Sequence, residues 1–197
     1  MHHDADKNDP LPDINPEDIV KREVIEPPPA TNERSMSRRV ALQVLYELDT
    51  THHQVGDVIN GQVNQQSLTP KTVRYLRDIV QGVIDNRQRL DAVIQHFAPE
   101  WPLSQVAVID RNILRMAVYE FTIYQQTPMR VAINEAVELA KLFGAEGAAR
   151  FVNGVLGALS DHPETTQAIL NDAAYQPHIA AQDAAPPEPD DANDVSE

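Results

Sequence analysis

The chain has 197 residues, no cysteine and a formal net charge of −14, so disulfides and thiolate-based sites are excluded. Residues 1–33 hold nine acidic and three basic side chains, residues 34–160 hold twelve and thirteen, and residues 161–197 hold nine and none. The acidic balance therefore belongs to the two ends and does not exclude a polyanionic partner for the middle. No signal-peptide core and no run of about 18 apolar residues is present, which predicts a cytoplasmic protein that does not enter a membrane.

The two ends differ in composition from the middle. Residues 1–33 contain six prolines among scattered acids, and residues 161–197 are rich in proline, alanine and acidic residues. Neither segment has enough apolar area to offset the entropy of ordering a chain. We therefore predict disordered tails at 1–33 and 161–197 around one folded domain at 34–160.

The first half of that domain reads as helices. One begins near Ser35, with Ser35 or Ser37 as its N-cap. A weaker helix spans 55–63, and Thr69-Pro70 is typical of the start of a third. The helical spacing continues to 84 and resumes at 90–97 after a predicted kink or break at 86–89.

The segment from Pro99 to Pro102 is a stiff linker, and we expect Trp101 within it to plug the core between two halves. The spacing then predicts a long helix from Ser104 to about Gln126. Two more helices follow within 131–159, joined at 143–146, where Gly144 is expected to end the first by adopting the left-handed conformation. The prediction is an all-α protein of six or seven helices, with about three on each side of the linker.

Polar residues interrupt the apolar pattern of the last two helices. Asn134 and Glu135 lie one turn into the first, and Asn153-Gly154 interrupts the second. Either they form interhelical hydrogen bonds and close packing, or they belong to an exposed recognition surface. The spacing favours hydrogen bonds that pin the helices.

The sequence contains no clear motif for catalysis or metal binding. The histidines lack the spacing of a zinc site, and the glycines lack the strand and lysine of a phosphate-binding loop. Glu135 and Glu138 share one helix side, which is more typical of a solvated face than of an acid–base pair. We predict no catalytic site, no metal and no cofactor.

Three arginines cluster where the first helix begins: Arg34, Arg38 and Arg39. The helix dipole disfavours cations there by up to roughly 1 kcal/mol each. Such a cluster indicates either an external anion or a solvated face.

Four blocks carry a more specific signal: RRVALQVLY at 38–46, ILRMAVYE at 113–120, VAINEAVELAK at 131–141 and FVNGVL at 151–156. In this order they resemble the NusB family of transcription antitermination factors, over about residues 35–160. The resemblance implies two packed three-helix subdomains and no catalysis. It also implies pairing with the small-subunit ribosomal protein NusE, binding of boxA-type RNA, and action within an RNA polymerase antitermination complex on ribosomal RNA operons.

The resemblance also implies site residues. Those expected to bind RNA, by phosphate contact or by stacking, are Arg34, Arg38, Arg39, Gln43, Tyr46, Arg115 and Phe151. Those expected to face the protein partner are Asp110, Arg111, Tyr119 and Glu120.

The chain departs from the family pattern at two places. Gly147 stands where an acid is common, and the stretch from Ser35 to Ser37 stands where further bases are common. Fewer phosphate contacts imply lower RNA affinity and a shallower salt dependence. The alternative function is therefore a protein–protein adaptor or homodimer with weak or lost RNA binding. A NusB-like module also begins a family of ribosomal RNA cytosine methyltransferases, but this sequence has no length left for such a domain.

Overall fold

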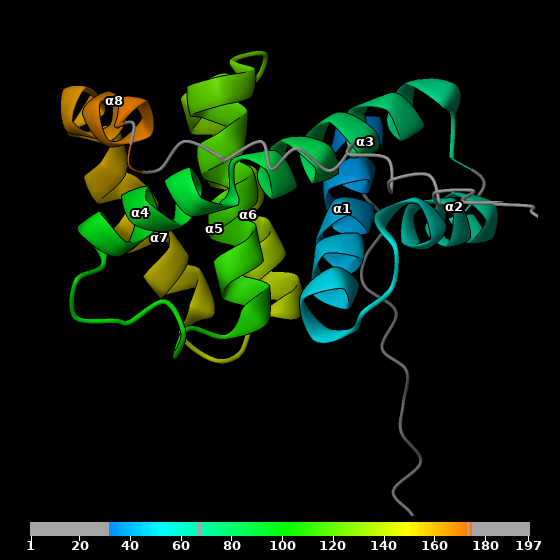
Figure 1. Cartoon of the computed structure of the whole chain (residues 1–197), viewed down its shortest axis with the longest axis horizontal. Helices are drawn as coiled ribbons and strands as arrows, with labels where there is room; N and C mark the ends of the chain where they lie inside the picture. Colours follow the sequence, from blue (N-terminus) through cyan, green and yellow to red (C-terminus); the bar gives the residue numbers. More distant parts are fainter. Residues whose placement is uncertain (1–31, 67, 173, 175–197) are drawn as a thin grey trace, which may run out of the picture.

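A computed structural model describes residues 32–66, 68–172 and 174, and every regular element within them is helical. The predicted tail residues 1–31 and 175–197 lie outside the described part. Figure 1 shows the helices in chain order: α1 (Glu33–Thr50), α2 (Val55–Gln66), α3 (Pro70–Asp85), α4 (Arg87–Phe97), α5 (Val108–Tyr119), the π-helical turn η2 (Glu120–Tyr124), α6 (Met129–Phe143), α7 (Ala148–Ser160) and α8 (Pro163–Asn171).

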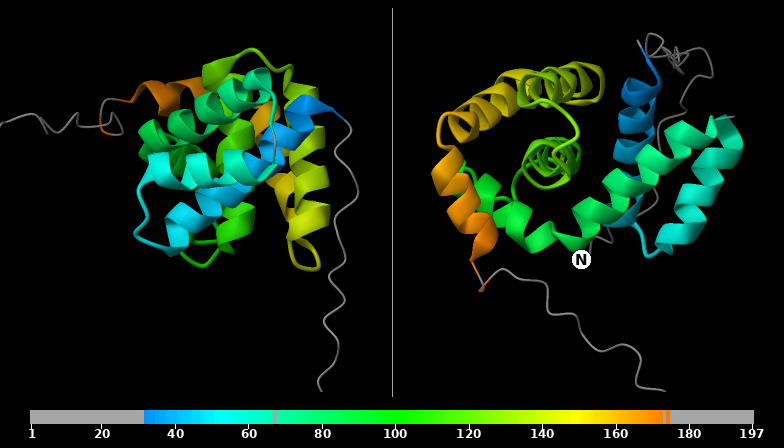
Figure 2. Two further views of the ribbon diagram at one scale, coloured as in Figure 1. Left: turned by 90° about the vertical axis from the view of Figure 1, so that its right-hand side faces the viewer. Right: turned by 90° about the horizontal axis from the view of Figure 1, so that it is seen from above.

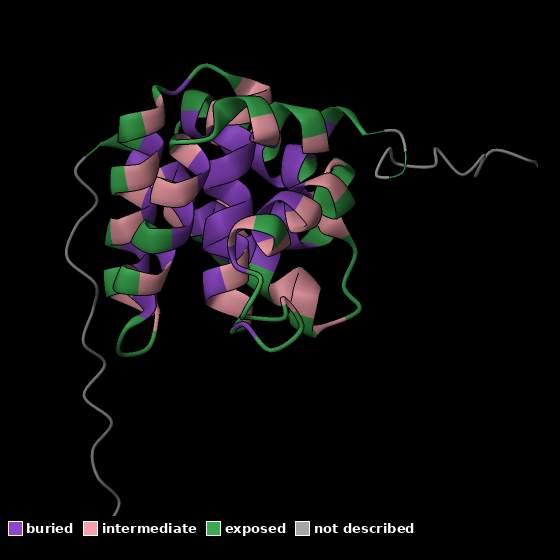
Figure 3. Ribbon diagram, turned by 90° about the vertical axis from the view of Figure 1, so that its left-hand side faces the viewer, coloured by how far each residue is buried: buried purple, intermediate pink, exposed green. Residues whose placement is uncertain are grey.

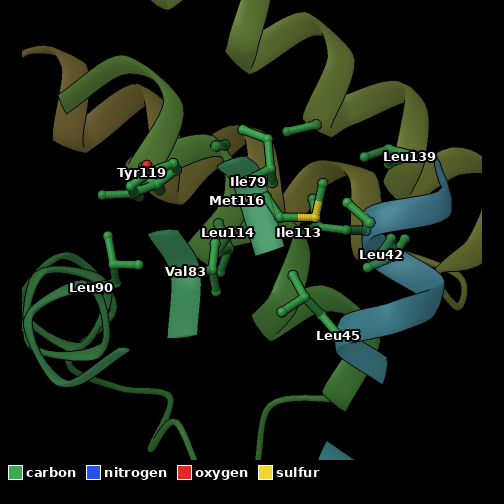
Figure 4. Close-up of a cluster of buried hydrophobic side chains, with 14 of the residues drawn as sticks. Leu42, Leu45, Ile79, Val83, Leu90, Ile113, Leu114, Met116, Tyr119 and Leu139 are labelled. Atoms are coloured by element: carbon green, nitrogen blue, oxygen red, sulfur yellow. The ribbon is translucent and has the colours of Figure 1, made fainter. Parts of the chain in front are cut away.

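Helix α5 is the centre of the fold. Seen from above, the other helices surround it, with α6 and α7 on one side and α3 and α4 on the other (Figure 2). Every residue from 112 to 120 is buried, so the helix is covered all round rather than on one stripe (Figure 3). Apolar side chains from α1, α3, α4, α5 and α6 meet in the core beside it (Figure 4).

The predicted all-α architecture is confirmed for the described residues. Helices α1–α3 form one set and α5–α7 another, while α4 continues the line of α3 and packs on α5 and α7 (Figure 1). The predicted break at 86–89 falls between α3 and α4. The predicted start of α3 is also confirmed, because the Thr69 side chain accepts a hydrogen bond from the Thr72 amide and Pro70 opens the helix.

Other predicted boundaries were wrong. Asn32, rather than a serine, caps α1, since its side chain accepts a hydrogen bond of 2.9 Å from the Ser35 amide. The long helix begins at Val108 instead of Ser104 and becomes π-helical at Glu120, ending at Gln125 with a φ of 54°.

The link between α6 and α7 uses its glycines differently from the prediction. Gly144 ends α6 with an ordinary φ of −81°, and the left-handed residue is Gly147, with a φ of 89°. Gly144 is required for another reason: a Cβ there would collide with the Ala148 Cβ and the Ala140 carbonyl oxygen. Close packing of α6 against α7 therefore selects this glycine.

The prediction of a tail from 161 onwards is corrected by α8. Pro163 opens this nine-residue helix, and Thr166 and Leu170 are buried. Arg89 on α4 donates a 2.6 Å hydrogen bond to the Leu170 carbonyl oxygen near the end of α8. One apolar contact surface is enough to order a short helix, although the acidic sequence around it favours disorder.

None of the described helices is both long and apolar enough to cross a bilayer. Within the same residues, no group of three histidine, cysteine or acidic side chains is placed to hold a metal ion.

Candidate nucleic-acid interface

Arg38 lies inside the protein, in an ion pair with Glu120. Its Nε is 2.8 Å from one carboxylate oxygen of Glu120, and an NH2 hydrogen bond of 2.8 Å reaches the other. The Tyr75 and Thr127 hydroxyls also donate to Glu120. Both charged side chains are at most 4% exposed, so this is a buried bidentate ion pair. The two hydroxyls add further hydrogen bonds to its carboxylate.

Electrostatics in this cluster favour the charged pair. Burial lowers the pKa of Arg38, but the hydrogen bond and charge of Glu120 outweigh it and raise the pKa above its ordinary value. The pKa of Tyr75 is also raised, first by burial and then by the Glu120 carboxylate. The expectation that Arg38 meets an external phosphate is therefore corrected: its anion is internal. Glu120, expected to face a partner, is 1% exposed and serves as that anion.

Glu135 ties α6 to the start of α1. It accepts a 2.9 Å hydrogen bond from the Ser35 hydroxyl and lies 3.2 Å from Arg38 NH1. The pinning role favoured by the sequence therefore describes Glu135. It does not describe Asn134 or Asn153, whose side chains are exposed on α6 and α7.

Arg115 forms a second internal cluster with acids from α1 and α4. Its Nε is 2.6 Å from Asp91 and its NH1 is 3.0 Å from Asp49. Arg111 also approaches Asp49, at 3.5 Å. Arg115 is 3% exposed, so the expectation of a direct RNA contact is corrected. The guanidinium instead joins α1, α4 and α5.

Two more residues expected at the partner interface are packed inward. Tyr119 is 8% exposed, and its ring occupies the place where a Cβ on Gly82 would lie, so α3 needs glycine there. Burial raises the pKa of the Tyr119 hydroxyl. Asp110 is 9% exposed, and its Oδ1 has no hydrogen-bond partner among the described residues.

The Asp110 carboxyl gives a prediction about pH. Burial raises its pKa, so the folded state holds the proton to a higher pH than the unfolded state does. The wild type should lose stability as the pH rises through that folded pKa, whereas Asp110→Asn cannot titrate. The melting temperature of the variant minus that of the wild type should increase between about pH 4 and about pH 8. A difference that stays constant across this range would contradict the assignment.

The other residues of α1 that are predicted to bind RNA lie in two separate places. Arg39, Gln43 and Tyr46 follow at helical spacing; Arg39 is half-buried, Gln43 is exposed and Tyr46 is 44% exposed. Arg34 lies elsewhere, with its guanidinium 5.2 Å from the centre of the Tyr75 ring. These four residues keep their predicted RNA role as a proposal.

An aromatic pocket opens between α7 and the loop before α5. Trp101 is 59% exposed, which corrects its predicted role as a core plug, and its ring lies 6.1 Å from that of Phe151, near perpendicular at 65°. The cavity measures about 320 Å³, and Asp110 lies on its wall. The sequence analysis predicted that Phe151 binds RNA, but it did not include Trp101 among the site residues. The signal was present, because a tryptophan flanked by Pro99 and Pro102 is held on a surface loop.

Comparison with known proteins identifies the family. Residues 35–161 match the NusB family model. A transcription antitermination protein NusB from Roseiflexus castenholzii is 43% identical over 128 residues, covering 64% of this chain and 90% of the relative. NusB of T. maritima has a similar structure, with a TM-score of 0.61, 26% identity, and coverage of 68% of this chain and 96% of that one. A chain from a crystal structure of antitermination factors NusB and NusE in complex with dsRNA shares the fold, with a TM-score of 0.61, 24% identity and coverage of 66% and 96%. The chain therefore belongs to the NusB family.

Proposed function

We propose that this chain is a transcription antitermination factor that binds RNA together with NusE. Family membership supports the biological role, and the aromatic pocket is the observation that supports RNA binding. We further propose boxA-type RNA as the ligand and an RNA polymerase complex on ribosomal RNA operons as the setting, in the cytoplasm.

The pocket has the chemistry to hold an unpaired base. Sequence-specific readers of RNA stack splayed-out bases on aromatic rings and bond to their edges. Trp101 and Phe151 offer two near-perpendicular rings at the pocket mouth. Asp110 also lines the pocket, but its unpartnered Oδ1 is shielded from solvent, so the stacking rings are the feature that fits a base. Arg150 lines the neighbouring surface and is exposed, so it is available to a phosphate.

Burial of two arginines supports dependence on a partner. Arg38 and Arg115 are each 3% exposed, which removes two of the expected phosphate contacts. The slope of log affinity against log salt scales with the number of phosphates neutralised, so the chain alone should bind RNA weakly. A partner that adds its own contacts to the same RNA would supply the missing affinity. The same burial favours the alternative, an adaptor that binds RNA weakly even with its partner.

Removing the ring of Trp101 tests the proposed site. Stacking of a base on an aromatic side chain is worth about 1–3 kcal/mol, so Trp101→Ala should weaken RNA binding by the NusE complex about tenfold. Trp101→Phe should recover much of the loss, because any aromatic face can stack. Fluorescence anisotropy with a short single-stranded boxA-type RNA measures the affinity.

The matched control is Val131→Ala on α6, another large apolar residue that is 44% exposed. It should leave RNA affinity unchanged. Equal affinities for the wild type, Trp101→Ala and Phe151→Ala would refute the pocket as the RNA site and favour the adaptor.

A further inference from the structure

A cleft with uncommitted positive charge lies where α1 and α3 begin. Its volume is about 360 Å³, and it is lined by Asn32, Glu33, Arg34, Ser37, Lys71, Thr72, Arg74, Tyr75, Asp78 and Tyr124. Both helices direct their N-terminal ends to this place, which adds partial positive charge. We call it the basic cleft.

The cations of the basic cleft differ from the other arginines of the fold. Arg34, Lys71 and Arg74 are exposed, and none of the three forms an ion pair with an acid among the described residues. Arg34 donates a long hydrogen bond of 3.4 Å to the Gln126 carbonyl oxygen and lies over the Tyr75 ring, but no acid in the described part of the chain neutralises it. By contrast, each of the internal arginines Arg38 and Arg115 lies within 3.0 Å of a carboxylate.

The two acids of the cleft are engaged with neighbouring hydroxyl groups. Glu33 accepts a hydrogen bond from the Thr69 hydroxyl, and Asp78 accepts one from Tyr124, each at 3.4 Å. The cleft thus presents three free cations beside the Tyr124 ring, an arrangement that suits acidic groups flanking a small apolar side chain.

The chain itself carries a segment of matching charge, which is joined in sequence to the residues that line the cleft. Residues 1–31 hold eight acids and three bases and join α1 at Asn32, which lines the cleft. The sequence Glu23-Val24-Ile25-Glu26 places two carboxylates around two apolar side chains. Glu26 precedes Asn32 by six positions, a reach of up to roughly 20 Å. This segment lies outside residues 35–161, which match the family model.

We propose that the acidic segment around residues 23–26 docks in the basic cleft of its own chain and competes there with RNA. Docking pairs its carboxylates with Lys71, Arg74 and Arg34. Because Arg34 is also a proposed phosphate ligand, occupation by the segment lowers the affinity for RNA. The docking part of the proposal depends only on the basic cleft, whereas the competition part rests on the proposed function.

Zero-length cross-linking of the full chain tests docking. A carbodiimide joins a carboxylate to a lysine only when the two are in contact. Lys71 lines the cleft, and Lys141, exposed on α6 beside Glu138, is the matched control. We expect amide cross-links between Lys71 and acids of residues 1–31, with few to Lys141. Mixing isotope-labelled with unlabelled chain should yield links within one chain only. Equal yields at the two lysines, or links between chains, would overturn docking.

RNA affinity tests competition. Glu23→Gln with Glu26→Gln should strengthen RNA binding by the NusE complex about threefold, the size expected for losing two exposed ion pairs. The control, Glu188→Gln with Asp190→Asn, removes two charges from the other end and should have less effect. Equal gains in both variants would indicate general repulsion and refute competition at the cleft. If no RNA binds in any form, the proposed function fails while cross-linking at Lys71 still decides docking.

Discussion

Replacing Glu120 by alanine is expected to lower the free energy of unfolding by about 3–5 kcal/mol. The substitution leaves the Arg38 guanidinium 3% exposed and without its bidentate partner, and it also removes the acceptor of the Tyr75 and Thr127 hydroxyls. Glu135 approaches the same guanidinium at 3.2 Å but is itself partly exposed, so it compensates only in part. Urea denaturation followed by circular dichroism measures the change.

Two controls separate this effect from simple loss of charge. Glu138→Ala removes the acid of the exposed pair with Lys141 and should cost less than about 1 kcal/mol. Replacing both Arg38 and Glu120 by apolar residues of similar volume should recover much of the loss, because neither charge is then stranded. A cost for Glu120→Ala no greater than that for Glu138→Ala would mean that the buried pair does not hold the fold.

The same reasoning governs how Arg38 variants behave in RNA assays. Arg38→Ala strands the Glu120 carboxylate at 1% exposure, so weaker RNA binding by this variant would follow from unfolding. Arg34 and Arg39, which are not buried, are the arginines whose removal reports on phosphate contact.

Replacing Arg115 by alanine is expected to lower the free energy of unfolding by about 2–4 kcal/mol, the second large effect. It removes a guanidinium that lies 3.0 Å from the Asp49 carboxylate, 6% exposed, and 2.6 Å from the Asp91 carboxylate, 28% exposed. The cost should lie below that of Glu120→Ala because Arg87 and Arg111 also approach Asp49, at 3.0 and 3.5 Å. Thermal and urea unfolding measure the loss.

Arg87→Ala is the matched control, since it removes a 52% exposed arginine from the same aspartate. It should cost less than about 1 kcal/mol alone. In the background of Arg115→Ala it should cost more, because Asp49 then depends on the remaining cations. Strict additivity of the two substitutions would show that they do not share Asp49.

The helices were predictable where local sequence decides them. Thr69-Pro70 marks the start of α3 by chemistry within four residues. The burial of Arg38 depends on its contact with Glu120, which lies 82 positions further on. The sequence pattern at the start of α1 holds no information about that contact. Ion-pair partners distant in sequence therefore made two internal arginines resemble surface residues.

The candidate site shows the same limit. Phe151 was predicted from the family resemblance to bind RNA, and this role stays a prediction, while Trp101 was misplaced because large aromatic residues are usually buried. The proline-bounded loop holds Trp101 at the surface, where its ring lies beside that of Phe151. Helix α8 was missed because its order comes from packing on α4, which its acidic surroundings do not reveal.

The central claim is most directly tested by titrating a boxA-type RNA with the full chain, alone and with equimolar NusE, at two salt concentrations. The account predicts weak, salt-sensitive binding by the chain alone and clearly tighter binding with NusE. A scrambled RNA of the same length should bind more weakly to the complex. RNA affinity that NusE leaves unchanged would contradict the account.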